Sequence, residues 1–191
     1  MNKPLYLCVG KSASGKTTVA EILESQYNLK SIQSYTTRPK RYENETGHTF
    51  ITEDEFDTLE NIMGYNKYNG YRYCCTKEQL DEADIYVVDV PGVETLLDRY
   101  QSERPIVIFY FDASICTRID RMMNRHDSDM QIVSRIYNDE KSDWFTALKA
   151  LRWHHAYELH KNVVLHVIYA NEDLDNVLTQ VTEYIKELEN N

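Results

Sequence analysis

Apolar runs alternate with segments of helical periodicity along most of this 191-residue chain. Four apolar runs have the length and the flanks of buried strands: 5–9, 85–90, 105–111 and 163–170. Apolar residues recur at helical spacing in four other segments: 18–23, 93–100, 115–160 and 174–188. Strands that alternate with helices are typical of a parallel sheet covered by helices on both faces. The pattern therefore predicts an α/β fold.

The segment between residues 31 and 80 interrupts this alternation. Thr52 with Glu55, and Thr76 with Gln79, have the spacing of a capping box, which begins a helix. Between them, residues 62–75 are rich in tyrosine, and their Asn and Gly favour a small antiparallel unit. We therefore expect a single domain, 1–191, divided as follows: a core of 1–30, 81–115 and 143–191, an inserted lobe at about 31–80, and an arginine-rich insertion at about 116–142.

Composition and charge narrow the class of protein. A chain of this length suits one compact domain, and no apolar run is long enough to span a membrane. No signal peptide is visible before the first predicted strand, and the four cysteines do not indicate a disulfide scaffold, so we expect a cytoplasmic location. The net charge of −10 repels nucleic acid and anionic membranes. We therefore expect a small-molecule partner, without nucleic acid or membrane.

Residues 10–17, Gly-Lys-Ser-Ala-Ser-Gly-Lys-Thr, match the phosphate-binding pattern G-x-x-x-x-G-K-[ST] between a predicted strand and a predicted helix. In this pattern the glycines let backbone N–H groups surround phosphate oxygens at the start of a helix. Lys16 reaches the β- and γ-phosphates, and the hydroxyl of Thr17 binds Mg²⁺. The predicted nucleotide-binding residues are Gly10, Lys11, Ser12, Ala13, Ser14, Gly15, Lys16, Thr17 and Thr18.

Asp89 follows the second apolar run and is a candidate metal ligand. In enzymes with a phosphate-binding loop, a carboxylate after another strand holds part of the Mg²⁺ shell. Many strands also end in Asp because the following turn favours it. Beside the loop, the metal role is the better interpretation, and we expect Thr17 and Asp89 to hold Mg²⁺ directly or through water.

Basic side chains gather in two further segments. Residues 34–41 combine two arginines, a lysine and several hydroxyl groups in a loop that Pro39 stiffens, which favours anion binding. The second segment carries four arginines on predicted helices that flank residues 124–129: Arg118, Arg121, Arg125 and Arg135. Arginines on a mobile segment can stabilise the charge of a transferring phosphoryl group. The alternative is a solvated helix face that pairs with nearby carboxylates: Asp120, Asp127 and Asp129.

Several stretches spread from residue 5 to near residue 185 match the motifs of one enzyme family. The most specific is Ser34-Tyr-Thr-Thr-Arg-Pro-Lys-Arg41 with Glu45-x-Gly47 and Phe50, which is similar to the run S-x-T-T-R-x-x-R…E-x-G…Y-x-F. The remaining matches are Tyr73 with G-N-x-Y-G, Asp89-Val-Pro-Gly92 with D-V-Q-G, residues 119–136 with L-x-x-R-L-x-x-R…R-L, and residues 169–174 with V-N-D-D-L. By these motifs the chain resembles guanylate kinase.

The resemblance to guanylate kinase implies a P-loop kinase core, an acceptor-binding lobe at about 31–80 and a helical lid at about 116–142. It implies ATP-dependent phosphoryl transfer to a nucleoside monophosphate, with GMP as the first candidate and Mg²⁺ as the metal. The implied acceptor-binding residues are Ser34, Arg38, Arg41, His48, Tyr73 and Cys75. The residues implied to stabilise transferred charge are Lys16, Arg121, Arg125 and Arg135, and Asn171 is implied to lie near the adenine.

Departures from the family pattern gather at the end that reads the base. Gly64 stands where the family has its guanine-binding Glu, Cys75 where it has Ser or Thr, and Val87 where it has an Asp. Losing such hydrogen-bonding partners changes discrimination by orders of magnitude, so phosphoryl transfer is better supported than guanine specificity.

Two alternatives remain open from the sequence. One is a P-loop kinase that acts on another phosphorylated acceptor, such as a ribose phosphate or another nucleotide. The other, of a different class, is a guanylate-kinase-like interaction module without catalysis. Such modules tend to lose the phosphate-binding loop, which this chain keeps. The sequence leaves open whether the protein is a monomer or a homodimer.

Overall fold

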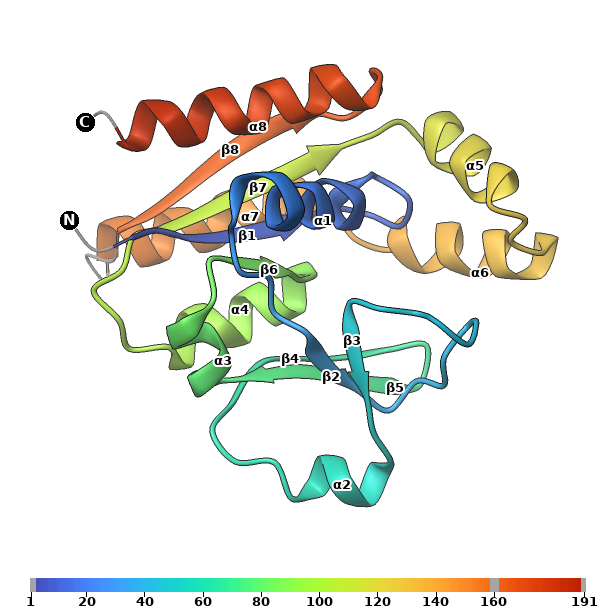
Figure 1. Cartoon of the computed structure of the whole chain (residues 1–191), viewed down its shortest axis with the longest axis horizontal. Coiled ribbons are helices and arrows are strands. Elements are labelled where there is room, and N and C mark those ends of the chain that lie inside the picture. Colours follow the sequence, from blue (N-terminus) through green and yellow to red (C-terminus); the bar gives the residue numbers. More distant parts are fainter. Residues whose placement is uncertain (1–2, 159–161, 190–191) are drawn as a thin grey trace.

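The structure is a computed structural model that describes residues 3–158 and 162–189. Within these residues the core is a four-stranded parallel sheet in the order β6-β1-β7-β8 (Figure 1). Its strands are β1 (Leu5–Val9), β6 (Ile85–Val87), β7 (Ile106–Asp112) and β8 (Val163–Tyr169). The fold is therefore mixed α/β with a parallel central sheet, as the alternating pattern predicts.

Helices cover both faces of the central sheet, because successive strand residues point to opposite sides. The flanking helices are α1 (Lys16–Tyr27), α4 (Val90–Arg99), α7 (Trp144–Trp153) and α8 (Leu174–Glu189). Tyr6 and Cys8 of β1 share one core cluster with buried residues of α1 and α8. Leu5 and Leu7 share the other cluster with α4 and α7. None of the described helices is both long and apolar enough to cross a membrane.

Residues from the inserted lobe form a second sheet, which lies on the opposite side of the core from α8 (Figure 1). Its order is β3-β2-β5-β4, and its strands are β2 (Ser34–Thr36), β3 (His48–Phe50), β4 (Ile62–Tyr68) and β5 (Tyr71–Thr76). Strands β4 and β5 pair antiparallel, as residues 62–75 predict. Both predicted capping boxes are formed, by Thr52 at α2 (Glu53–Asp57) and by Thr76 at α3 (Lys77–Glu82).

The helical stretch predicted at 115–160 is broken into separate elements. They are α5 (Ile115–Asn124), α6 (Asp129–Asp139), α7 and a π-helical turn η1 (His154–Glu158). His126 has a left-handed backbone with φ of 61°, and the side chain of Ser128 caps α6. Asp143 caps α7 in the same way. Apolar periodicity alone shows one stretch because it continues across the breaks that these short polar residues introduce, and residues 159 and 160 of that stretch lie outside the described residues.

Candidate functional site

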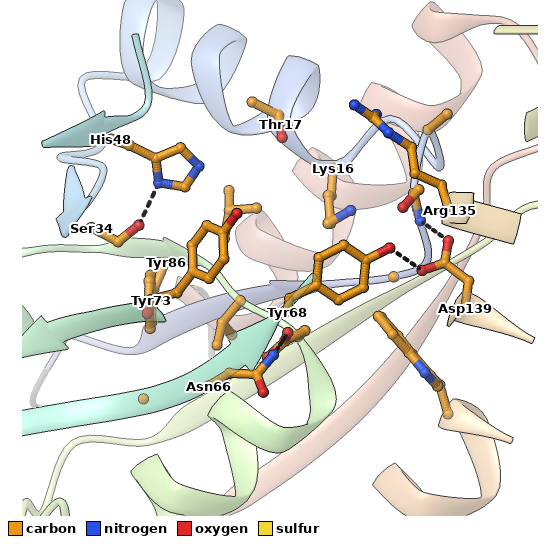
Figure 2. A pocket seen from close by; sticks show the side chains of 18 of the residues that line it. Lys16, Thr17, Ser34, His48, Asn66, Tyr68, Tyr73, Tyr86, Arg135 and Asp139 are labelled. Atoms are coloured by element: carbon orange, nitrogen blue, oxygen red, sulfur yellow. Dashed lines mark hydrogen bonds between the residues drawn. The ribbon is translucent and has the colours of Figure 1, made fainter. Parts of the chain in front are cut away.

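A cavity of about 220 Å³ lies among the loop at 10–17, the second sheet and the helices α5 and α6. Figure 2 shows side chains from the loop, the second sheet and α6 that face one another across it. Twelve predicted site residues line it: Gly10, Ser12, Ala13, Lys16, Thr17, Ser34, Arg41, His48, Tyr73, Asp89, Arg125 and Arg135. Residues that lie more than 100 positions apart in the sequence thus meet around one cavity. Its wall includes cationic side chains from three separate segments of the chain.

Two predicted acceptor-binding residues lie away from the wall of this cavity. Arg38 is buried and forms an ion pair with the buried Glu45, with 2.8 Å between the guanidinium nitrogen and the carboxylate oxygen. Glu45 also accepts the backbone N–H of Arg41 at 2.6 Å, so Arg38 holds the loop that presents Arg41. Cys75 lies in a core cluster, and its thiol is 3.6 Å from the carbonyl oxygen of Met63.

Two other predicted residues contact backbone next to the site. Arg121 donates to the carbonyl oxygens of Ser14 at 3.2 Å and of Ala170 at 2.8 Å. The side-chain oxygen of Asn171 accepts the N–H of Ser114 at 2.6 Å, which ties the turn after β8 to the start of α5. In this structure both residues therefore hold the phosphate-binding loop and its neighbouring turns in place. The other predicted loop residues, Lys11, Ser14, Gly15 and Thr18, lie in the loop and the first turn of α1 without lining the cavity.

The loop follows β1 directly and ends at the start of α1, as the motif predicts. The ammonium of Lys16 donates to the carbonyl oxygen of Lys11 at 3.1 Å. Burial lowers the pKa of Lys16 to about 8, although the nearby carboxylates of Asp139 and Asp89 oppose this shift. An ammonium at the start of a helix, beside the backbone groups of the loop, is suited to binding phosphate oxygens.

Asp89 lies beyond the end of its strand and caps α4. Strand β6 ends at Val87, so the predicted strand at 85–90 is shorter than expected. One oxygen of Asp89 accepts the N–H of Gly92 at 3.0 Å, and the other accepts a hydrogen bond from the amide of Asn66. Burial raises the pKa of Asp89, and these hydrogen bonds and Lys16 oppose the shift.

The donor set fits Mg²⁺ bound mainly through a substrate. Thr17 and Asp89 offer one hydroxyl and one carboxylate beside the loop. Among the described residues no group of three His, Cys, Asp or Glu side chains could hold a metal ion. A few protein oxygens together with waters and substrate phosphates are the usual Mg²⁺ environment in phosphoryl-transfer enzymes.

Four of the predicted acceptor-binding residues meet at one end of the cavity: Ser34, Arg41, His48 and Tyr73. The hydroxyl of Ser34 and Nδ1 of His48 lie 2.7 Å apart (Figure 2). Burial, and then the charge of Arg38, lower the pKa of His48 to about 4, so the imidazole is neutral near pH 7. Burial, and then the charge of Arg135, lower the pKa of Arg41. Like charges therefore converge at this end, which is suited to a dianionic phosphate monoester.

Two of the arginines predicted for a lid approach the same place: Arg125, which caps the end of α5, and Arg135 of α6. Asp127 accepts from Arg125 at 2.7 Å and lies 3.3 Å from Arg135. Burial of Asp127 raises its pKa, but the hydrogen bond from Arg125 and the charge of Arg135 outweigh it and lower the pKa overall. Pairing with Asp127 was predicted for a solvated helix face, yet both arginines also line the cavity.

Tyr86 shapes the end of the cavity at which a base would be read, by the resemblance to guanylate kinase. Gly64 and Val87, two of the departures from the family pattern, line the cavity there. A Cβ added at Gly64 would lie 2.8 Å from Cε1 of Tyr86 and 3.0 Å from its hydroxyl oxygen. The phenol ring thus fills the space that a side chain at position 64 would need.

Some residues of the cavity wall were not found from the sequence: Tyr68, Tyr86, Asp139 and Trp144. None belongs to a motif. The one available signal was Tyr86, because a tyrosine within an apolar strand usually directs its hydroxyl to a polar partner.

Comparison with known proteins gives one relative of matching length. No protein-family model matches the chain. A guanylate kinase from Thermotoga maritima is 24% identical over 196 aligned positions, which cover 97% of this chain and 87% of that protein. The chain is similar to a guanylate kinase over nearly its whole length. This similarity and the parallel sheet flanked by helices agree with a P-loop kinase core.

Proposed function

We propose that the protein is an ATP-dependent kinase that transfers a phosphoryl group to a phosphate monoester, with a nucleoside monophosphate as the first candidate acceptor. One observation carries the proposal: Lys16, Arg41, Arg125 and Arg135 line one cavity beside a complete phosphate-binding loop. Similarity to a guanylate kinase over 97% of the chain supports the same reaction class. In a protein with a net charge of −10, such a cluster of cations is a stronger indication of an anionic substrate.

The proposed roles follow from where the residues lie. The loop and Lys16 bind the donor phosphates, and Asn171 lies on the side proposed for the adenine. Arg41, Tyr73 and His48 bind the acceptor phosphate, and Arg125 and Arg135 stabilise charge on the transferred group. When bound, ATP supplies the γ-phosphoryl group, and Mg²⁺ neutralises charge on its phosphates. Thr17 and Asp89 would hold the metal, directly or through water.

A phosphotransfer assay with ATP and Mg²⁺ against a panel of nucleoside monophosphates and sugar phosphates tests this function. We expect turnover with at least one acceptor, and we expect Lys16→Ala to abolish it while its circular dichroism spectrum stays that of the wild type. No transfer to any acceptor, together with no ATP binding in calorimetry, would favour a non-catalytic interaction module.

The identity of the acceptor is part of the same proposal. Tyr86 occupies the space beside Gly64, and Cys75 faces a backbone carbonyl in the core. The base end therefore offers few polar groups for guanine, and we propose weak discrimination among bases or a different phosphorylated acceptor. A preference for GMP over AMP of about 10³ or more, the range that well-paired polar groups supply, would refute this part.

A further inference from the structure

Arg118 of α5 is buried, with 1% of its side chain exposed, and contacts two carboxylates at the end of α6. Its guanidinium lies 3.1 Å from the carboxylate of Asp139, which is equally buried, and forms a second ion pair with Glu140. Removing a charged pair from water costs several kcal/mol per ion, so a buried pair is weak evidence for stability alone. Its position points to another role.

Both carboxylates reach the phosphate-binding loop. The carboxylate of Asp139 accepts the backbone N–H of Ser12 at 2.7 Å, and that of Glu140 accepts from the ammonium of Lys11 at 2.9 Å. The hydroxyl of Tyr68 lies 3.4 Å from the other oxygen of Asp139, as Figure 2 shows. The end of α6 is thus attached to the loop at two consecutive residues.

The loop needs such support because its backbone is strained next to Ser12. Ala13 has φ of 61°, a left-handed conformation that costs a non-glycine residue roughly 1–2 kcal/mol. Surrounding contacts must hold a residue in such a conformation. Asp139 holds one side of Ala13, and Arg121 donates to the carbonyl oxygens on the other side, at 3.4 Å for Ala13 and 3.2 Å for Ser14.

The charges of this contact are balanced. Arg118 and Lys11 supply two positive charges, and Asp139 and Glu140 supply two negative charges. The positive charge of Arg118 therefore offsets the negative charge of Asp139, so that little net negative charge lies beside the loop. A compensated carboxylate can hold a backbone N–H in position without repelling a polyphosphate strongly.

We propose that Asp139, oriented by Arg118, is a positioning residue that presets the phosphate-binding loop for the donor through the N–H of Ser12. The inference rests on the proposed donor role of the loop. Ordering the loop before the nucleotide arrives lowers the entropy lost on binding, and so raises affinity without a direct contact. It also connects the loop to α5 and α6, the helices that carry Arg125 and Arg135.

Two double variants isolate the hydrogen bond to Ser12. Arg118→Met with Asp139→Asn replaces the buried ion pair but keeps a side-chain oxygen that can accept from Ser12. Arg118→Met with Asp139→Ala removes that acceptor as well. Both share the loss of Arg118, so effects on global stability are closely matched. Asp129→Asn, at the exposed start of α6, is the control outside the contact.

Calorimetry with ATP and Mg²⁺ measures the effect on the donor site. We expect the Asp139→Ala double variant to bind ATP about tenfold more weakly than the Asp139→Asn double variant. A ratio of this size corresponds to the free energy of one hydrogen bond of typical strength. The KM for the acceptor should differ little between them, and Asp129→Asn should bind like the wild type. Equal affinities in the two double variants would overturn the proposal, and so would tighter binding by the Asp139→Ala form, because Asp139 would then compete with phosphate.

Amide hydrogen exchange in nucleotide-free protein, followed by NMR, provides a readout that does not depend on substrate. The Ser12 amide should exchange faster in the Asp139→Ala double variant than in the Asp139→Asn double variant, while amides of the central sheet exchange alike. Unchanged exchange at Ser12 would refute the positioning role. If the wild type failed to bind ATP, the proposed function would fail, and exchange at Ser12 would still decide whether Asp139 holds the loop.

Discussion

Replacing Gly64 by alanine tests whether Tyr86 closes the base end of the cavity. Gly64 has φ of 57°, so an alanine there incurs backbone strain of roughly 1–2 kcal/mol. Its Cβ would also lie 2.8 Å from the ring of Tyr86, and relieving such overlap in a packed site costs about 1–3 kcal/mol. We therefore expect Gly64→Ala to lower the free energy of unfolding by about 2–5 kcal/mol.

Gly70 supplies a matched control for this change. It has φ of 86° in the turn between β4 and β5, and a Cβ there would meet nothing within 4 Å. Gly70→Ala should therefore show the backbone cost alone, about 1–2 kcal/mol. The difference between the two variants measures the contact with Tyr86.

Chemical denaturation with a linear extrapolation measures both free energies of unfolding, and thermal melts add a second reading of about 2–4 °C per kcal/mol for a chain of this size. In a Tyr86→Leu background, the smaller side chain should reduce the cost of Gly64→Ala to that of Gly70→Ala. Equal costs for the two alanine variants in the wild-type background would show that Tyr86 does not fill the space beside position 64.

Three further outcomes follow from the site. Arg125→Ala should lower kcat by about 10³ or more with little change in ATP affinity, because an arginine that acts on the transferring phosphoryl group stabilises the transition state; a change confined to KM would refute that role. Arg41→Ala should raise the KM of every acceptor by a similar factor, whatever its base, since Arg41 lies with the phosphate-binding groups; a base-dependent effect in the acceptor panel would contradict this. As the pH is lowered from 6.5 to about 4, the unfolded chain protonates His48 while the folded protein does not. The free energy of unfolding should therefore decrease as the pH decreases across this window. Denaturation at pH 7 and pH 4.5 should show a smaller fall for His48→Asn, and equal falls would contradict the lowered pKa.

Much of the fold could be predicted from local patterns. The apolar runs of β1 and β7 stand out because strands buried on both faces are almost wholly apolar. The capping boxes at Thr52 and Thr76 predicted two short helices because a cap acts between residues three positions apart. Periodicity alone does not show the breaks around His126 and Asp143, because it reports which face is apolar and not where the helix axis turns.

The candidate site divides in the same way. The loop at 10–17 could be predicted because phosphate binding through backbone groups requires a fixed spacing of residues. Arg38 and Arg121 were assigned to substrate from their motifs, but in this structure they contact Glu45 and backbone carbonyl oxygens. Motif spacing identifies an arginine, and only the packing of its helix or loop decides what its guanidinium reaches. The role of Asp139 depends on contacts between distant segments, which leave no local pattern.

The electrostatics of the cavity connect its structure to an anionic substrate. Burial lowers the pKa of Lys16 to about 8, and burial and the charge of Arg135 lower the pKa of Arg41, whose side chain is still 47% exposed. The shift of Lys16 means that the folded protein holds this positive charge at a cost in stability. Proteins accept such a cost mainly at functional sites, where a ligand of opposite charge offsets it. This cost falls at the phosphate-binding loop, while the space between Gly64 and Tyr86 is closely packed, which agrees with the proposal that the substrates are held more through their phosphates than through an acceptor base.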